Sequence, residues 1–164
     1  MNSIVITGAA GFIGSHLAEY YLKAGYKVYG LDNFYTGSQS NVEYLKKLSA
    51  NFKFIEADVT RDWTELDDLK NLKYVFHFAS PASPPLYQKL ALETLWVNSI
   101  GLNKALQFAD YHRARVIFAS TSEVYGDPEF SPQPESYWGN VNSFGERSCY
   151  DESKRFGEAL LFSH

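Results

Sequence analysis

The chain has 164 residues, the length of one domain, and its 45% hydrophobic content is enough to bury a sizeable core. Its net charge of −4, with the 15 Lys and Arg scattered, argues against a nucleic-acid-binding surface, and no apolar run reaches membrane-spanning length. One cysteine excludes an internal disulfide, and we expect no signal peptide, because Met1-Asn2-Ser3 leads straight into the first strand. We therefore expect a cytoplasmic protein without a membrane partner, a nucleic-acid partner or a metal site.

Short apolar runs alternate with helical patterns along the chain, which predicts an α/β fold with a doubly wound parallel sheet of the Rossmann type. The predicted strands are residues 4–6, 27–31, 52–55, 73–78 and 114–119. Helical patterns occupy about 12–22, 42–48, 63–69, 87–111 and 148 to the end. Pro81, Pro84 and Pro85 predict a loop, and the aromatic, proline-rich segment 127–142 predicts an ordered loop over a site.

A glycine-rich turn follows the first strand. Gly8 permits the tight turn, Gly11 the close approach of a pyrophosphate, and Gly14 the packing of the helix on the strand. The second apolar run ends at Asp32, about 20 residues further on, where a dinucleotide-binding unit places the carboxylate that holds the adenosine ribose. The alternative is a plain turn with Asp32 as a loop cap. An acidic Asp32 without a neighbouring arginine favours NAD over NADP.

Polar residues also follow the later strands. Asp58 comes after the third strand, Ser80 after the fourth, and residues 120–123 after the fifth. Because ligands of doubly wound sheets bind beyond the carboxyl ends of the strands, these placements predict one site at that edge. The hydroxyls of residues 120–122 could instead bond to the local backbone.

Tyr150 and Lys154 stand four residues apart on the last predicted helix, so both project from one face. A nearby ammonium is expected to lower the pKa of a tyrosine phenol toward neutrality, which a tyrosine needs to accept a proton from an alcohol. The alternative is a surface pair. Glu123 supplies a carboxylate for acid–base chemistry or for the electrostatics of a decarboxylation.

At these residues the chain resembles the extended short-chain dehydrogenase/reductase family. Within it, the chain looks most like the UDP-glucuronate decarboxylases, or UDP-xylose synthases. The shared motifs are residues 7–14, 32–33, 79–87, 120–126, 135–142 and 145–154. Nucleotide-sugar 4,6-dehydratases and 4-epimerases share the cofactor motifs, but segments 137–142 and 147–150 match them less well. Small departures stand at Leu90, Leu102, Ser143, Phe144 and Ser153.

The resemblance implies a role for each residue of the reactive group. Thr121 would hydrogen-bond the sugar 4-hydroxyl, and Tyr150 would remove its proton while hydride passes to NAD. Lys154 would bind the nicotinamide ribose and tune Tyr150. The resulting β-keto acid loses carbon dioxide, with Glu123 and Ser122 assisting there and in reprotonation at C5. Returning the hydride yields UDP-xylose.

The resemblance also implies a wider set of contacts. Cofactor-binding residues would be Gly8, Gly11, Phe12, Ile13, Gly14, Asp32, Asn33, Thr36, Gly37, Asp58, Val59, Phe78, Ala79, Ser80, Asn98, Tyr150 and Lys154. Residues on the side of the UDP-sugar substrate would be Pro81, Tyr87 and Arg147. Cys149 is expected to be a small buried residue beside Tyr150.

Family members are roughly twice as long, so residues 1–164 are expected to form an incomplete NAD-binding Rossmann domain without the C-terminal substrate domain. The chain would then be the cofactor-binding half of a decarboxylase, inactive alone, as a remnant or as one half of a split enzyme. The alternative is a non-catalytic NAD-binding or interaction module. An open edge at the fifth strand and helices that serve as the dimer interface in relatives predict a homodimer or a complementary C-terminal half as partner.

Overall fold

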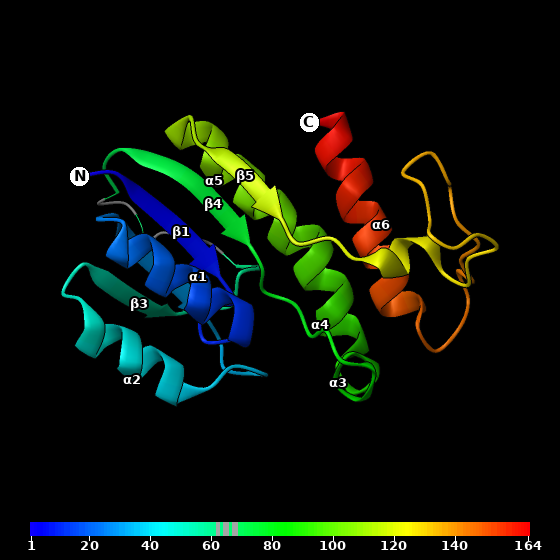
Figure 1. Ribbon diagram of the computed structural model, residues 1–164, viewed down its shortest axis with the longest axis horizontal. Coiled ribbons are helices and arrows are strands. Elements are labelled where there is room, and N and C mark those ends of the chain that lie inside the picture. The colour runs from blue at the N-terminus through cyan, green and yellow to red at the C-terminus, as the bar shows by residue number, and fades with distance from the viewer. Residues whose placement is uncertain (62, 64–65, 67–68) are drawn as a thin grey trace. The chain divides into compact units, whose positions relative to one another are not determined.

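The computed structural model describes residues 1–61, 63, 66 and 69–164 (Figure 1). The chain divides into two compact units. Unit 1 contains Met1–Ser80 and Ile100–Ala119, and unit 2 contains Pro81–Ser99 and Ser120–His164. The helix expected over residues 63–69 lies mostly outside the described residues.

Unit 1 is built on a sheet of five parallel strands in the order β3-β2-β1-β4-β5. This is the arrangement of a Rossmann-type half, with the first strand at the centre and the chain crossing over to build both sides. The predicted doubly wound α/β fold is confirmed. The strands are β1 (Ser3–Thr7), β2 (Lys27–Asp32), β3 (Phe52–Glu56), β4 (Leu72–His77) and β5 (Arg115–Phe118).

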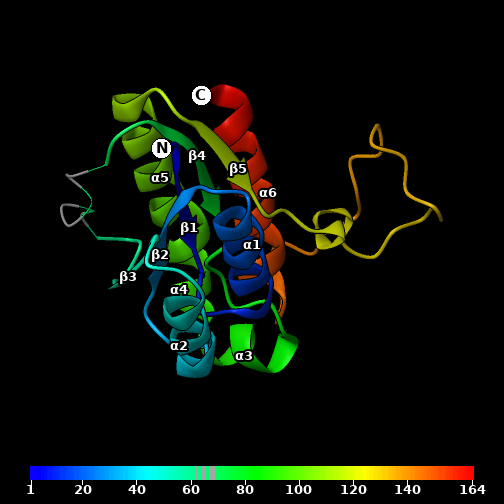
Figure 2. The same cartoon turned by 60° about the vertical axis from the view of Figure 1, so that its left-hand side comes forward.

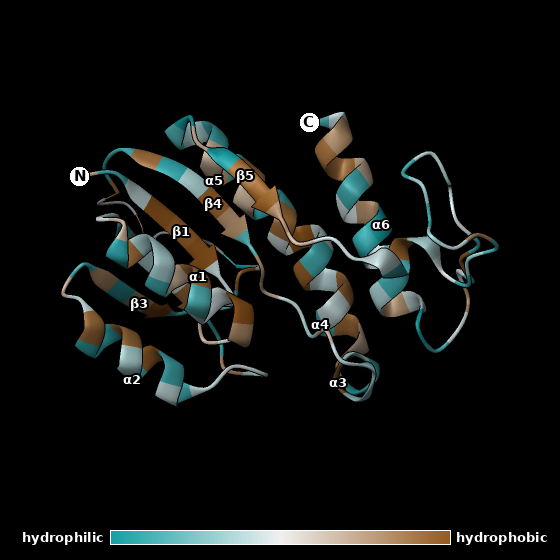
Figure 3. Ribbon diagram, viewed as in Figure 1, coloured by the Kyte–Doolittle hydropathy of each residue, from teal (hydrophilic) through white to brown (hydrophobic). Residues whose placement is uncertain are grey.

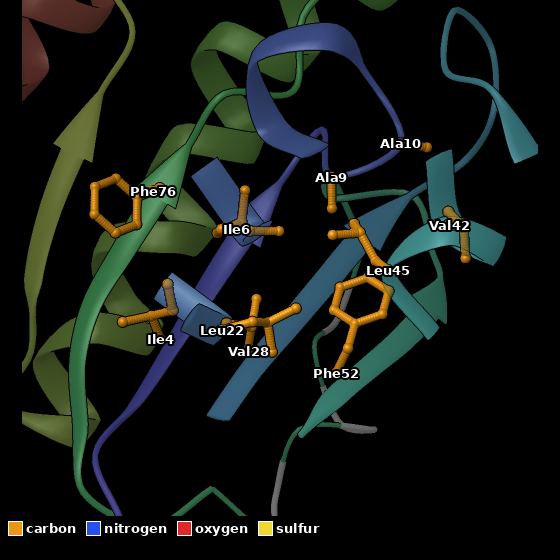
Figure 4. Close-up of a cluster of buried hydrophobic side chains, with 11 residues drawn as sticks. Ile4, Ile6, Ala9, Ala10, Leu22, Val28, Val42, Leu45, Phe52 and Phe76 are labelled. Carbon is orange, nitrogen blue, oxygen red and sulfur yellow. The ribbon is translucent and has the colours of Figure 1, made fainter. Parts of the chain in front are cut away.

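The helices of unit 1 cover the two faces of this sheet. They are α1 (Phe12–Lys23), α2 (Gln39–Leu48) and α5 (Leu102–His112), and Figure 2 shows α5 on the side of the sheet opposite α1. β1 is buried along its whole length, and its central residues Ile4, Val5 and Ile6 are apolar, which Figure 3 shows in brown. Figure 4 shows one core, in which the labelled side chains of β1, β2, β3 and β4 meet those of α1 and α2.

Unit 2 is mostly helical. It holds α3 (Pro84–Lys89), α4 (Ala91–Trp96), the 3-10 turn η3 (Ser122–Tyr125) and α6 (Ser148–Ser163), and α3 and α4 both pack against α6. The predicted loop over 127–142 has no helix or strand, and an isolated bridge joins Gly126 to Asn140. The final predicted helix is confirmed with its start at Ser148.

Two expectations between β4 and β5 are wrong. Pro84 and Pro85 do not lie in a loop but begin α3, because the first turn of a helix needs no N–H partner and proline is preset for it. The helix expected over 87–111 is interrupted at Leu90 and carries the π-helical turn η2 (Val97–Gly101) before α5. The hydroxyls of Thr94 and Ser99 bond to carbonyls one turn back, a contact that bends helices.

No helix among the described residues is long and apolar enough to cross a membrane.

Candidate functional site

The turn between β1 and α1 is possible only with glycine at two positions. Gly8 has φ +74°, and a Cβ there would stand 2.9 Å from the backbone of Phe78 and Ala79. A Cβ on Gly14 would stand 2.1 Å from the carbonyl oxygen of Gly8, so α1 starts against the turn itself. Any larger residue would push the helix away from the strand. The glycine spacing therefore creates a turn whose backbone packs directly against the backbone after β4 and against the first turn of α1.

Asp32 lies at the carboxyl end of β2 and holds this turn. Its carboxylate accepts hydrogen bonds from the amides of Ala10 and Phe34, both at 2.9 Å, and the residue is buried. Burial raises the pKa of the Asp32 carboxyl, while the backbone hydrogen bonds act against that rise. Gly37 packs on the same side, because a Cβ there would lie 2.7 Å from Ala10 and 3.0 Å from Asp32 Oδ1.

The N-terminus of α1 opens directly on the turn. Gly11 is the N-cap, no side chain in the described part of the chain caps the helix, and the first turn carries no acidic residue. Phe12 and Ile13 are exposed, at 78% and 63%. A twelve-residue helix with an uncapped start presents partial positive charge and outward-pointing amides to an anion.

Thr7 links the end of β1 to the end of β4. Its Oγ1 accepts hydrogen bonds from the amides of Phe78 and Ala79, both at 3.0 Å, and lies 3.2 Å from Nδ1 of the buried His77. This oxygen therefore fixes the loop at Ser80 beside the glycine turn.

Most of the other residues expected to bind a cofactor also belong to unit 1. Asp58 closes a turn by accepting from the amide and hydroxyl of Thr60, and Val59 is buried. Asn33 accepts from the amide of Tyr35, and Thr36 is exposed. Asn98 lies in unit 2, where its side chain donates to Thr94 O and Ser153 Oγ and so joins α4 to α6.

The reactive side chains expected from the sequence come together within unit 2. Tyr150 and Lys154 lie one turn apart on α6, and both are buried. The Lys154 Nζ stands 5.7 Å from the centre of the Tyr150 ring. Burial lowers the pKa of Lys154 to about 7. Thr121 is the N-cap of η3, where its Oγ1 accepts a hydrogen bond from the Glu123 amide, and hydrogen bonding by the same side chain acts to lower the pKa of the Tyr150 phenol.

The pKa of the Tyr150 phenol departs from the expectation. Burial raises it, and the negative charges of Glu123 and Asp151 raise it further. The Thr121 hydrogen bond and the Arg147 cation act in the opposite direction but do not outweigh burial. A lowered phenol pKa is therefore not seen in the structure, because desolvation is the larger effect.

A chain of charges stands beside the phenol. The Arg147 guanidinium contacts the Glu123 carboxylate directly and lies 3.6 Å from Asp151 Oδ2. Glu123 and Arg147 are partly exposed, whereas Asp151 is buried. Arg147 therefore partly neutralises the two carboxylates whose negative charges raise the pKa of Tyr150.

The remaining expected residues of unit 2 have varied surroundings. Tyr87 is buried and stacks on Tyr150, and Pro81 is also buried. Ser122 is exposed in the 3-10 turn. Cys149 is buried, as expected, and its thiol lies 3.5 Å from the Tyr87 carbonyl oxygen.

Two residues of this group were missed from the sequence. Asp151 stands four residues after Arg147 on a helix, a spacing that predicts an ion pair and was available as a signal. Arg155 donates to the carbonyls of Val124 and Trp138, at 2.8 and 2.9 Å, and so ties η3 and the proline-rich loop to α6. One carbonyl belongs to a short 3-10 turn and the other to an irregular loop, so no sequence spacing indicates this contact.

The described residues contain no group of three or more His, Cys, Asp or Glu side chains that could hold a metal ion.

The geometry of unit 1 accommodates the diphosphate of a dinucleotide. The turn has backbone where side chains would otherwise stand, a helix N-terminus opens on it, and a buried carboxylate ends the neighbouring strand. A parallel sheet with this turn after its central strand defines the Rossmann class of dinucleotide-binding folds.

Residues 4–164 match the NAD dependent epimerase/dehydratase family, and the chain belongs to that family. UDP-glucuronic acid decarboxylase 1 of Xenopus tropicalis is 46% identical over 162 residues, which are 98% of this chain and 37% of that protein. UDP-glucuronic acid decarboxylase 5 of Arabidopsis thaliana is 45% identical over 164 residues, and the match covers 98% of this chain and 46% of that protein. The chain thus spans less than half the length of these relatives.

Solved structures of the family share the fold. UDP-glucose 4-epimerase from Bifidobacterium longum, in complex with NAD+ and UDP, has a TM-score of 0.83 at 25% identity over 99% of this chain and 48% of that chain. UDP-N-acetylglucosamine 4-epimerase from Methanobrevibacter ruminantium has a TM-score of 0.83 at 31% identity over 99% of this chain and 50% of that chain. The sequence-based assignment to the extended dehydrogenase/reductase family is confirmed.

Proposed function

We propose that this chain is the NAD-binding portion of a nucleotide-sugar enzyme that converts UDP-glucuronate to UDP-xylose. The identity of 45–46% with UDP-glucuronic acid decarboxylases over nearly the whole chain carries the proposal. The site agrees with it, because unit 1 has a diphosphate-binding turn and unit 2 gathers a tyrosine, a lysine, a threonine and a glutamate.

In this proposal the residues of unit 1 hold the ADP half of NAD. The amides at the start of α1 and the turn from Gly8 to Gly14 bind the diphosphate, and Asp32 orients the adenosine ribose. Each carboxylate oxygen of Asp32 has a second lone pair beyond its bond to the backbone. The carboxylate would repel the additional phosphate of NADP, so the site selects NAD.

The residues of unit 2 perform the proton transfers. When bound, NAD supplies the hydride acceptor for the sugar C4 carbon and the hydride for the later reduction. Tyr150 takes the proton of the 4-hydroxyl, and Thr121, whose side chain acts on the ionisation of the phenol, orients that hydroxyl. Lys154 binds the nicotinamide ribose, and its ammonium stabilises the phenolate when it is charged.

Loss of carbon dioxide then follows from the position of the new carbonyl. The C4 carbonyl is β to the sugar carboxylate, so the electrons of the C5–C6 bond move into the carbonyl as carbon dioxide leaves. Glu123 and Ser122 assist this step and return a proton to C5. Arg147 holds Glu123 and lies on the substrate side.

The first test is calorimetric titration of the 164-residue chain with NAD, NADP and UDP-glucuronate. We expect weak NAD binding, weaker NADP binding and no measurable sugar-nucleotide binding, because more than half of each curated relative has no counterpart in this chain. Absence of NAD binding would contradict the proposal. Release of UDP-xylose by this chain alone would contradict the expectation that it is inactive by itself.

The second test concerns the reaction. The chain is fused to the residues that follow the matched region in the Xenopus tropicalis relative and incubated with UDP-glucuronate and NAD. We expect UDP-xylose and carbon dioxide. A C4 epimer or a dehydrated sugar would instead support an epimerase or dehydratase, the activities named for solved structures that this chain resembles. No reaction despite NAD binding would favour a non-catalytic module.

We also propose that the chain self-associates. Large apolar side chains are exposed on two packed helices of unit 2, Leu92 and Trp96 on α4 and Phe156 and Phe162 on α6. In unit 1, β5 is at the edge of the described sheet. Light scattering is expected to show a dimer or larger species, and Trp96→Glu combined with Phe156→Glu to reduce it. A monomer at working concentration would contradict this proposal.

A further inference from the structure

The rings of Tyr87 and Tyr150 form a parallel stack inside unit 2. Their centres are 4.8 Å apart and their planes differ by 7°. Both rings are buried, and they come from different helices, α3 and α6. Offset parallel stacking is one of the preferred arrangements of aromatic pairs. One face of the Tyr150 ring is therefore covered by Tyr87.

Tyr87 is held firmly from its backbone side. Pro84 and Pro85 restrict the first turn of α3, and the Cys149 thiol donates to the Tyr87 carbonyl oxygen. Ala91 and Leu95 of α4 pack against the cluster of Tyr87, Cys149 and Tyr150. The covering ring thus belongs to a packed assembly rather than to a loose surface side chain.

The Tyr87 hydroxyl does not contribute to this assembly. It is buried and has no hydrogen-bond partner among the described residues. A buried hydroxyl without a partner costs stability, so the favourable contribution of Tyr87 comes from the packing of its ring. Phenylalanine at this position would keep the stack.

We propose that Tyr87 is a positioning residue for Tyr150, whose ring sets the plane of the Tyr150 phenol and keeps water from its covered face. This proposal rests on the proposed function, in which Tyr150 is the base. A phenol held in one plane keeps its oxygen in one place for proton transfer, and the covered face contributes to the burial that dominates its ionisation. The resemblance places Tyr87 beside the substrate, whereas the geometry points to an action through Tyr150.

The test measures Tyr150 itself, by nuclear magnetic resonance of the chain labelled with 13C-tyrosine. Tyr150→Phe identifies the signal, and the ring-flip rate and phenol titration are then compared for Tyr87→Phe and Tyr87→Leu. Tyr137→Leu is the matched control, because Tyr137 stacks on Tyr125 in the same unit, at 5.9 Å and 22°. If Tyr87→Leu does not fold, Tyr87→Met replaces it, since methionine fills the volume without an aromatic face.

We expect Tyr87→Phe to leave Tyr150 unchanged. Tyr87→Leu should speed its ring flips about two- to tenfold, the factor that one stacked pair contributes. The pKa of Tyr150 should fall toward its usual value in Tyr87→Leu, because water reaches the ring. Tyr137→Leu should change neither quantity.

Three results would overturn the inference: no change of Tyr150 in Tyr87→Leu, an equal change in Tyr87→Phe, or an equal change in Tyr137→Leu. The NAD titration of the unaltered chain tests the proposed function separately. A chain that fails to bind NAD can still show the Tyr87 effect, so failure of one proposal is distinguishable from failure of the other.

Discussion

Replacing Gly14 with alanine tests whether the glycine turn works by close backbone approach. Gly14 lies in the first turn of α1, where alanine ordinarily stabilises a helix by about 0.5–1 kcal/mol over glycine. The added Cβ would stand 2.1 Å from Gly8 O, 2.8 Å from Gly8 C and 3.0 Å from Ala9 Cα. All three atoms are backbone, so no side chain can rotate away.

The expected sign is therefore the reverse of the helix preference. Relieving the contact requires the turn and the helix to separate by about 1 Å, and overpacking of this kind costs about 1–3 kcal/mol. After subtraction of the helical gain, we expect a net loss of about 1–2 kcal/mol. For a chain of this length that lowers the midpoint of thermal unfolding by about 2–8 °C. NAD affinity should fall more than tenfold, because the displaced atoms belong to the turn that is proposed to bind the diphosphate.

Gly25→Ala is the matched control. Gly25 follows α1 with φ +83°, and a Cβ there would have no atom within 4 Å. Backbone strain alone should cost about 1–2 kcal/mol. Thermal unfolding should therefore show similar losses of stability in both variants. NAD calorimetry should show a loss of affinity only in Gly14→Ala. A Gly14→Ala chain that is as stable as the original and binds NAD equally well would refute the steric reasoning.

Further predictions concern three charged residues. Asp32→Asn should raise the affinity for NADP relative to NAD in calorimetric titrations, because the repelling charge is removed; an unchanged ratio would contradict the assigned role. Arg147→Gln should destabilise the chain by about 1–2 kcal/mol, because the buried Asp151 carboxylate loses its cationic partner. The loss stays in this range because the Arg147 guanidinium is half exposed and solvent screens its charge. The same change should raise the pKa of Tyr150, measured by 13C titration, and a fall would be inconsistent with the charge arrangement. Lys154→Met should stabilise the chain in thermal unfolding at pH 7, and the gain should be smaller near pH 10. Burial lowers the pKa of Lys154 from 10.5 to about 7, so between these pH values the unfolded state binds more protons than the folded state. The stability of the unaltered chain therefore rises with pH in this window, and the destabilisation caused by the buried lysine decreases. A gain independent of pH would refute it.

Local patterns were sufficient for most of the fold. The apolar runs at β1 to β5 and the helical spacing of α1 and α6 matched the structure within a few residues, because strands buried on both faces and one-sided helices leave direct periodic signals. The prediction was wrong at Pro84 and Pro85, which begin a helix, and at the interruptions of the following helix up to residue 101. Proline is common both in loops and in the first turn of a helix, so its presence does not distinguish the two. A serine or threonine bends a helix only when its hydroxyl bonds to a carbonyl one turn back, and the sequence does not show whether that bond forms.

Residue identity and spacing alone determined that the chain carries a glycine turn, an acidic residue at the end of β2 and a tyrosine–lysine pair on one helix face. These features follow from steric freedom and helical geometry, which are local properties of the backbone. Only the tertiary structure decided the burial and the surroundings of that pair: Tyr150 is a buried phenol covered by Tyr87, and the nearby Glu123 is bound to Arg147. Burial and charge proximity depend on residues distant in the sequence, so no local pattern determines them.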